Sequence, residues 1–162
     1  MRLILSLAAA AALALGWTAR AQDAPLLAVA EVRASAGGQT TVDLVLVEAP
    51  EGLQQYSFSL TTSDANVVAL VDVAGVELSG PFFQVSGRSA ERLDFRALDL
   101  EDVIKPGDQD LVLARVTVNA VRDGTATLTL TATAFVDDRG VKVEPEVQQG
   151  RVTVGQAAPP PT

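Results

Sequence analysis

The residue pattern near the C-terminus strongly restricts what this chain can fold into. From Thr125 to Ala134, threonine occupies every odd position and Ala or Leu every even position. Because successive side chains of a strand point to opposite faces, this alternation predicts a strand with one buried, apolar face and one hydroxyl-bearing face. Threonine rows can match flat polymers or ordered water, but we interpret this row first as β propensity on an exposed face.

Other segments alternate with the same period. The predicted inner faces hold Val42, Leu44 and Leu46 in segment 41–47, and Tyr56, Phe58 and Leu60 in segment 55–61. Segment 111–119 places Val112, Ala114, Val116 and Val118 inward and leaves Leu111 and Leu113 on the nominally wet face. Strands are predicted near 26–33, 40–48, 54–62, 67–73, 82–86, 91–97, 111–119, 125–135, 142–147 and 150–155. With turn residues between them and no helical spacing, they predict an all-β antiparallel sandwich or barrel.

The N-terminus has the three parts of a secretory signal peptide. Arg2 is followed by an apolar stretch from Leu3 to Trp17, and Ala19-Arg20-Ala21 supplies small residues for cleavage before Gln22. The apolar stretch is shorter than the roughly 20 residues of a membrane span. We therefore expect residues 1–21 to be removed, no membrane insertion afterwards, and a secreted or periplasmic protein.

Charge and composition exclude several functions. Removing residues 1–21 leaves 10 basic and 20 acidic residues, a net charge of −10. This balance argues against nucleic acid or an anionic membrane surface as partner. The chain contains no Cys and no His, which excludes a Cys nucleophile, a Ser-His-Asp triad and an ordinary zinc or copper site. No disulfide is available, so the fold must be held by packing and hydrogen bonds.

Five short segments carry a family resemblance through their order and spacing. They are Gly37–Val42, Gly52–Leu60, Asp64–Val68, Leu113–Val118 and Gly150–Val154. In this order they resemble a cohesin domain, the β-sandwich module that binds dockerin partners in cellulosomes. Thr62-Ser63-Asp64-Ala65 lacks the proline usual at that turn, so the chain is more similar to cohesin-like domains outside cellulosomes.

The resemblance implies a fold and a function. The fold is an antiparallel two-sheet jelly-roll sandwich of about nine to ten strands, expected over residues 22–155. The function is an exported, non-catalytic module that binds a protein or polysaccharide, with a link to polysaccharide breakdown. After the expected domain, three consecutive prolines predict a disordered tail over residues 156–162.

Acidic residues gather around the Pro106-Gly107 turn. A hard cation such as calcium takes six to eight oxygen ligands, and its candidate ligands here are Asp99, Asp102, Asp108 and Asp110, with Glu101, Asp137 and Asp138 nearby. Because no dedicated calcium loop is present, we expect solvated acids and no cofactor, with calcium as the alternative. A glycosidase also needs two carboxylates, but few aromatic residues are available to hold a sugar, so we expect no enzyme.

The polar side of strands 54–62 and 111–119 is the predicted partner-binding surface. Its residues are Gln55, Ser57, Ser59, Thr61, Arg115 and Thr117. The only adjacent aromatic residues, Phe82 and Phe83, are interpreted as plugging one end of the sandwich. The alternative function is a structural subunit of the cell envelope, assembled through edge strands.

Overall fold

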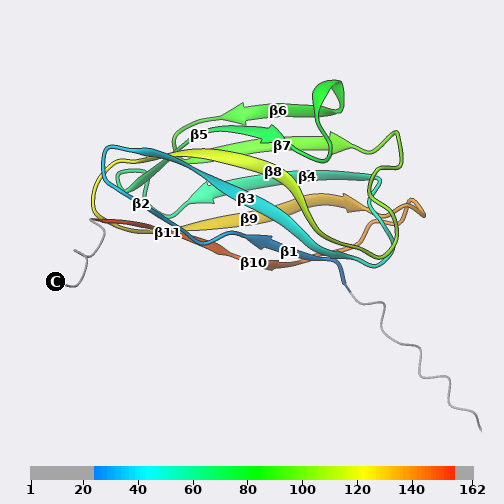
Figure 1. The fold of residues 1–162 in the computed structure, drawn as a ribbon. Helices are drawn as coiled ribbons and strands as arrows, with labels where there is room; N and C mark the ends of the chain where they lie inside the picture. Colours follow the sequence, from blue (N-terminus) through cyan, green and yellow to red (C-terminus); the bar gives the residue numbers. More distant parts are fainter. Residues whose placement is uncertain (1–23, 156–162) are drawn as a thin grey trace, which may run out of the picture.

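The computed structural model describes residues 24–155, which form two packed sheets (Figure 1). The signal peptide predicted over residues 1–21 and the tail predicted over residues 156–162 lie outside these residues. The elements are β1 (Leu26–Val29), β2 (Val32–Ala34), β3 (Gln39–Ala49), β4 (Gln55–Thr62), β5 (Val68–Gly75), the 3₁₀ helix η1 (Gly80–Phe82), β6 (Phe83–Arg88), β7 (Arg92–Leu98), β8 (Asp108–Ala120), β9 (Gly124–Val136), β10 (Glu146–Gln148) and β11 (Gly150–Val154). Among residues 24–155, no helix has the length and apolar character needed to cross a membrane.

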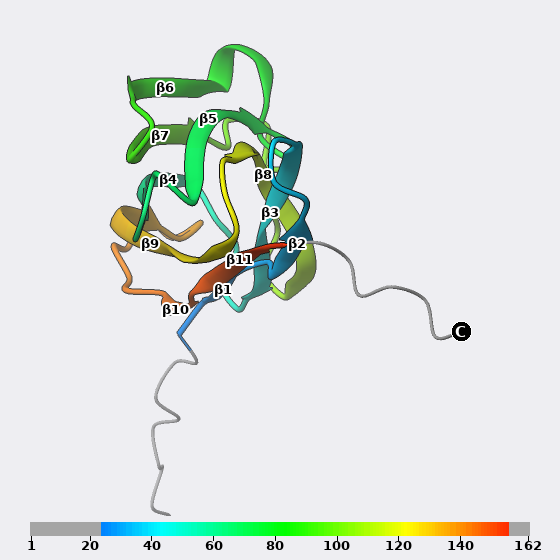
Figure 2. The ribbon, with the colours of Figure 1, turned by 90° about the vertical axis from the view of Figure 1, so that its left-hand side faces the viewer.

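The strands divide between a five-stranded sheet, ordered β10-β1-β3-β8-β5, and a six-stranded sheet, ordered β2-β11-β9-β4-β7-β6. The view along the sandwich in Figure 2 shows β6, β7, β4 and β9 in one layer and β8 and β3 in the other. The predicted two-sheet β-sandwich is therefore confirmed.

Both ends of the chain cross from one sheet to the other. The strand predicted over 26–33 is two strands, because β1 lies in the five-stranded sheet and β2 in the six-stranded sheet. The strand predicted over 142–147 is reduced to an isolated bridge at Lys142 and the short β10. Here the pairing is parallel, β1 with β10 and β2 with β11, whereas the other strand pairs are antiparallel as predicted.

A side-chain amide replaces the strand ladder where β10 gives way to β11. The Leu130 N–H donates to Gln149 Oε1 at 2.7 Å, and Gln149 Nε2 donates to the Leu130 carbonyl oxygen at 3.3 Å. These are the groups that a paired strand would satisfy. Gln149, the residue just before β11 begins at Gly150, therefore satisfies the next backbone groups of β9 beyond the β9–β11 ladder.

The core fills the space between the inner faces of the sheets. The predicted inward residues of segments 41–47 and 55–61 are all buried. At its centre, the Tyr56 and Phe58 rings stack with centroids 4.4 Å apart, and Phe95 meets both edge-on at 6.4 and 5.9 Å. Such arrangements match the quadrupoles of aromatic rings. Apolar packing thus stabilises the sandwich in a chain that has no disulfide.

A β-bulge changes which side chains of β8 face the core. Leu44 pairs with Ala114 and Val45 with Val112, so Leu113 is an extra residue in β8. One extra residue shifts the alternation by one position. Leu113 is consequently buried, Leu111 packs against the core and Val112 is only half-buried, so the predicted orientation of residues 111–113 is wrong.

The Tyr56 hydroxyl is buried without a hydrogen-bond partner, and burial raises the pKa of this phenol far above its ordinary value. An unsatisfied buried polar group lowers stability by about 1–3 kcal/mol. We therefore expect Tyr56→Phe, which keeps the ring stack on Phe58, to raise the free energy of unfolding by about 1 kcal/mol in urea denaturation. A lower stability for Tyr56→Phe would show that the hydroxyl contributes a favourable interaction.

Candidate partner-binding face

Polar residues on β7, β4 and β9 form an ordered outer face on the six-stranded sheet. Ser57 lies opposite Arg96 on β7 and Ala134 on β9. In the next row Ser59 lies opposite Asp94 and Thr131, and in the third Thr61 lies opposite Arg92 and Thr129. The strand alternation turns these residues outward because Tyr56, Phe58 and Leu60 face the core.

Hydrogen bonds fix the charged centre of this face. The Ser59 hydroxyl and the Arg92 guanidinium hold Asp94, and together they lower the pKa of its carboxyl. Arg92 Nε lies 2.9 and 3.0 Å from the two Asp94 oxygens. Arg96 donates from Nε and one terminal nitrogen to Gln84 Oε1, at 3.0 and 2.7 Å. The central side chains are therefore preorganised, and Ser59, predicted as an exposed contact, is buried beneath its neighbours.

Exposed apolar side chains occur at the end of β7 and in the loop that follows it. Leu98, the last residue of β7, lies opposite Gln55 and is 40% exposed. The loop that follows carries Leu100 and Val103, which are 67% and 41% exposed. Exposed apolar side chains that lie together beside polar ones are a feature of protein-binding surfaces. The sequence pattern did not predict these three residues, although two of them stand in a loop, where exposed apolar residues can indicate a binding surface.

The structure separates the two halves of the predicted binding surface. Gln55, Ser57, Ser59 and Thr61 lie together on the outer face of the six-stranded sheet. β8 lies in the other sheet of the sandwich (Figure 2). Its residues Arg115 and Thr117 point outward on that side, because Val116 and Val118 are buried. The prediction of one shared surface is wrong, because alternation shows which residues point outward but not which sheet a strand joins. A binding role for either set stays a prediction.

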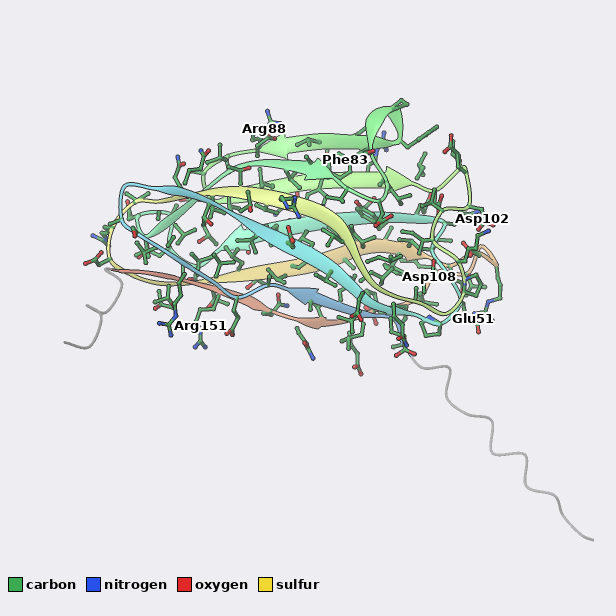
Figure 3. The ribbon with its side chains drawn as sticks, viewed as in Figure 1. Glu51, Phe83, Arg88, Asp102, Asp108 and Arg151 are labelled. Carbon is green, nitrogen blue, oxygen red and sulfur yellow. The ribbon has the colours of Figure 1, made fainter. Side chains whose placement is uncertain are left out.

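The four candidate calcium ligands lie in turns or on the surface. Asp99 Oδ1 and Oδ2 accept the Val103 and Ile104 N–H groups at 2.8 and 2.7 Å. Asp108 accepts the Lys105 N–H at 2.8 Å, Asp102 lies 3.1 Å from Lys105 Nζ, and Asp110 is exposed. Figure 3 shows Asp102 and Asp108 at the same end of the sandwich as Glu51. Within residues 24–155 no three acidic side chains converge on a cation position, so calcium binding stays a prediction without support from the geometry.

Two neighbouring aspartates at this end have opposite pKa shifts. Burial alone would raise the pKa of Asp137, but hydrogen bonds from the Arg139 side chain and from the Val141 and Arg139 N–H groups lower it. The pKa of Asp138 is raised by burial and by the negative charges of Asp102, Asp99 and Asp137. Asp138 Oδ2 is buried without a hydrogen-bond partner and packs against Gly52. The charged form of Asp138 therefore destabilises the fold.

We expect Asp138→Asn to raise the melting temperature at pH 7 by on the order of 1–2 °C, since the group is partly exposed and screened by solvent. A raised folded-state pKa means that wild-type stability falls as pH rises through that pKa. The gain should therefore vanish below about pH 4, where the carboxyl is protonated in both states. Melting curves at several pH values test this expectation. Asp110→Asn is the control, because it removes a negative charge from the exposed surface. Equal gains in melting temperature for the two variants would contradict the role of burial.

Comparison with known protein families and with curated proteins finds no match. Solved structures of cohesins are similar. A non-cellulosomal cohesin from the archaeon Archaeoglobus fulgidus is 17% identical, with a TM-score of 0.68, and the alignment covers 82% of this chain and 92% of that one. The seventh ScaB type I cohesin from Pseudobacteroides cellulosolvens is 17% identical, with a TM-score of 0.68 and coverage of 85% and 96%.

A third similar structure is the sixth cohesin of scaffoldin B from Acetivibrio cellulolyticus, solved in complex with a Cel5 dockerin mutant. It is 22% identical, with a TM-score of 0.68, and the alignment covers 82% of this chain and 99% of that one. These matches span nearly the whole sandwich at low sequence identity, so they concern the backbone arrangement. The chain therefore has the cohesin fold.

Proposed function

We propose that this chain is an exported, non-catalytic module that binds a protein partner on the outer face of β6, β7, β4 and β9. The observation that carries the proposal is the composition of this face. Its centre is a fixed network around Asp94 and Arg96, and its margin exposes Leu98, Leu100 and Val103. Rigid polar groups give specificity, and exposed apolar groups supply binding energy when they are covered.

The similar solved structures support a protein partner and suggest a first probe. A cohesin from Acetivibrio cellulolyticus and the Coh-OlpA cohesin of Clostridium thermocellum were each solved as complexes with a dockerin. A dockerin-like protein is therefore the first partner to try. The non-catalytic part of the proposal is supported by the absence of Cys and His from the sequence.

The location is part of the same proposal. The charged start, the apolar stretch and the Ala19-Arg20-Ala21 site support cleavage before Gln22 and work in the periplasm or outside the cell. A role near polysaccharide breakdown would follow if the partner carries such an enzyme. N-terminal sequencing of the protein from the secreted or periplasmic fraction tests the cleavage site, and an intact Met1 there would overturn it.

Ser57→Arg and Thr117→Arg form a matched pair that tests the proposed face. Both variants place an arginine at an outward-facing position of a strand, but the two strands belong to opposite sheets of the sandwich. The binding partner is a dockerin, or a protein captured from the envelope fraction and then purified. We expect Ser57→Arg to raise its Kd at least about tenfold, which is a loss of about 1.4 kcal/mol in binding free energy. Thr117→Arg should change Kd less than about twofold.

The reverse order of the two variants would place the binding surface on the five-stranded sheet instead. Failure to bind any protein from these sources would overturn the proposed function. Melting temperatures of both variants should be measured first, so that a loss of binding is not a loss of folding.

The alternative function, a structural envelope subunit built by strand addition, has less support. Two of the edge strands, β2 and β10, are three residues long. A third, β6, contains a bulge at Ser86. Short and bulged edges disfavour pairing with another chain. Concentration-dependent assembly in size-exclusion chromatography would nevertheless favour this alternative over a monomeric receptor.

A further inference from the structure

Two arginines at the margin of the six-stranded sheet have no carboxylate of residues 24–155 within ion-pair distance, although Glu31 lies beside them. In residues 24–155, the basic side chains that form ion pairs are Arg88, Arg92, Lys105, Arg115, Arg122 and Arg139. Arg33 on β2 and Arg151 on β11 form none of these pairs, and both are exposed. Two free guanidinium groups are unexpected in a protein with a net charge of −8.

Strand register places the two arginines on the same outer face. β2 and β11 are parallel, with Val32 opposite Val152 and Arg33 opposite Thr153. Val152 is buried, so Arg151 and Thr153 point outward, and Arg33 lies diagonally from Arg151. Paired strands lie about 4.8 Å apart and two residues rise about 6.6 Å along a strand, so the two Cα atoms are roughly 8 Å apart, close enough for long side chains to act on one ligand. Figure 3 shows Arg151 at the margin of the sandwich, with its side chain directed away from the body.

A shallow depression and a row of hydroxyls adjoin the two arginines. The depression has a volume of about 300 Å³ and is lined by Glu31, Val32, Arg33, Arg151 and Thr153. On the other side of β11, Arg151 lies opposite Thr127 and Thr153 opposite Thr125. Hydroxyl groups both donate and accept hydrogen bonds, as do the hydroxyls of a sugar. The threonine row of β9 thus continues directly from the arginine pair.

Aromatic side chains are absent from this corner of the described sandwich. Tyr56, Phe58, Phe95 and Phe135 are buried in the core, and Phe82 and Phe83 stand at the β6 margin, across the sheet from β2. No aromatic ring is therefore available at this corner for a neutral sugar to stack on. Charge and hydrogen bonds remain, and a guanidinium group binds a carboxylate through two parallel hydrogen bonds.

We propose that Arg33 and Arg151, with Thr125, Thr127 and Thr153, form a second binding site for a carboxylated polysaccharide. A polymer is required because one exposed ion pair contributes about 0–1 kcal/mol, whereas repeated carboxylates gain from effective concentration. An acidic peptide fits less well, since the β2 edge offers three residues for backbone pairing and leaves the hydroxyl row unused. Both sites use the outer face of β9, but Thr125 and Thr127 lie at the start of this strand, whereas Ser57 lies opposite Ala134 near its end.

Affinity electrophoresis with polygalacturonate as the probe tests this site. The wild-type chain should be retarded by polygalacturonate and not by its fully methyl-esterified form, which lacks the charge. The double variant Arg33→Gln/Arg151→Gln should bind at least about tenfold more weakly, and retardation should disappear in 0.5 M salt, where charges are strongly screened. Lys142→Gln is the matched control, because it removes an exposed positive charge elsewhere on the surface.

Three results would overturn the proposal. They are no retardation of the wild-type chain at low salt, equal retardation of the wild type and the double variant, and an equal loss of binding in Lys142→Gln. Poly-glutamate provides a further arm: arginine-dependent binding of poly-glutamate as tight as that of polygalacturonate would assign the site to acidic peptides instead. Ser57→Arg should leave polygalacturonate binding unchanged, which distinguishes this site from the proposed protein-binding face.

Discussion

Replacing Phe95 by alanine is expected to lower the free energy of unfolding by about 3–5 kcal/mol. Phe95 is fully buried and contacts three other rings, with centroids 6.4 Å from Tyr56, 5.9 Å from Phe58 and 5.8 Å from Phe83. The alanine variant loses these contacts and leaves a cavity that the two rigid sheets cannot close. Since a domain of this size is stabilised by about 5–15 kcal/mol, the variant should be close to unfolding.

Urea denaturation followed by circular dichroism measures this change, provided that the transition remains two-state. Phe82→Ala is the matched control, because it makes the same truncation at a half-buried position next to β6. We expect the control to lose less than about 1.5 kcal/mol. Similar losses for the two variants would mean that the aromatic cluster is not the centre of the core.

Replacing Asp99 by alanine is expected to lower the free energy of unfolding by about 2–3 kcal/mol, because it leaves two backbone donors without an acceptor. The carboxylate of Asp99 is 8% exposed and caps the turn through the Val103 and Ile104 N–H groups. Ile104 is fully buried, so the turn also anchors the loop to the core. Asp99→Asn keeps one acceptor oxygen and should lose about half as much.

Thermal and urea unfolding of Asp99→Ala should be compared with Glu101→Ala, which removes an exposed acid from the same loop. The control should change stability by less than about 0.5 kcal/mol. The loop also carries Leu100 and Val103, so Asp99→Ala should in addition weaken partner binding on the proposed face. If added calcium restored the stability of wild type after chelation, Asp99 would be a ligand and not a cap.

The fold could be predicted from the sequence because alternation reports directly on burial. Tyr56, Phe58 and Leu60 face the core as expected. The assignment of strands to sheets could not be predicted, because pairing depends on distant residues that no local pattern contains. This is why Ser57 and Thr117 were predicted on one surface and lie on opposite sides.

The predicted site was only partly recovered for a similar reason. Outward polar residues of β4 were identified, but the apolar margin at Leu98 comes from a strand end and a loop. The pairing of Arg33 with Thr153 brings together residues from the two ends of the chain, which periodicity does not show. Bulges such as that at Leu113 also reverse alternation without a marker in the sequence.

The parallel pairing of the terminal strands has a consequence for how the chain reaches its native state. Leu26 pairs with Glu146, and Val32 pairs with Val152. β1 can pair early with β3, but the partner of β2 is β11, so the six-stranded sheet is completed only when the last strand is available, and such long-range closure makes folding slow. A chain that needs its last strand to complete a sheet cannot reach the full native fold during synthesis. That delay suits a protein proposed to cross a membrane before it folds.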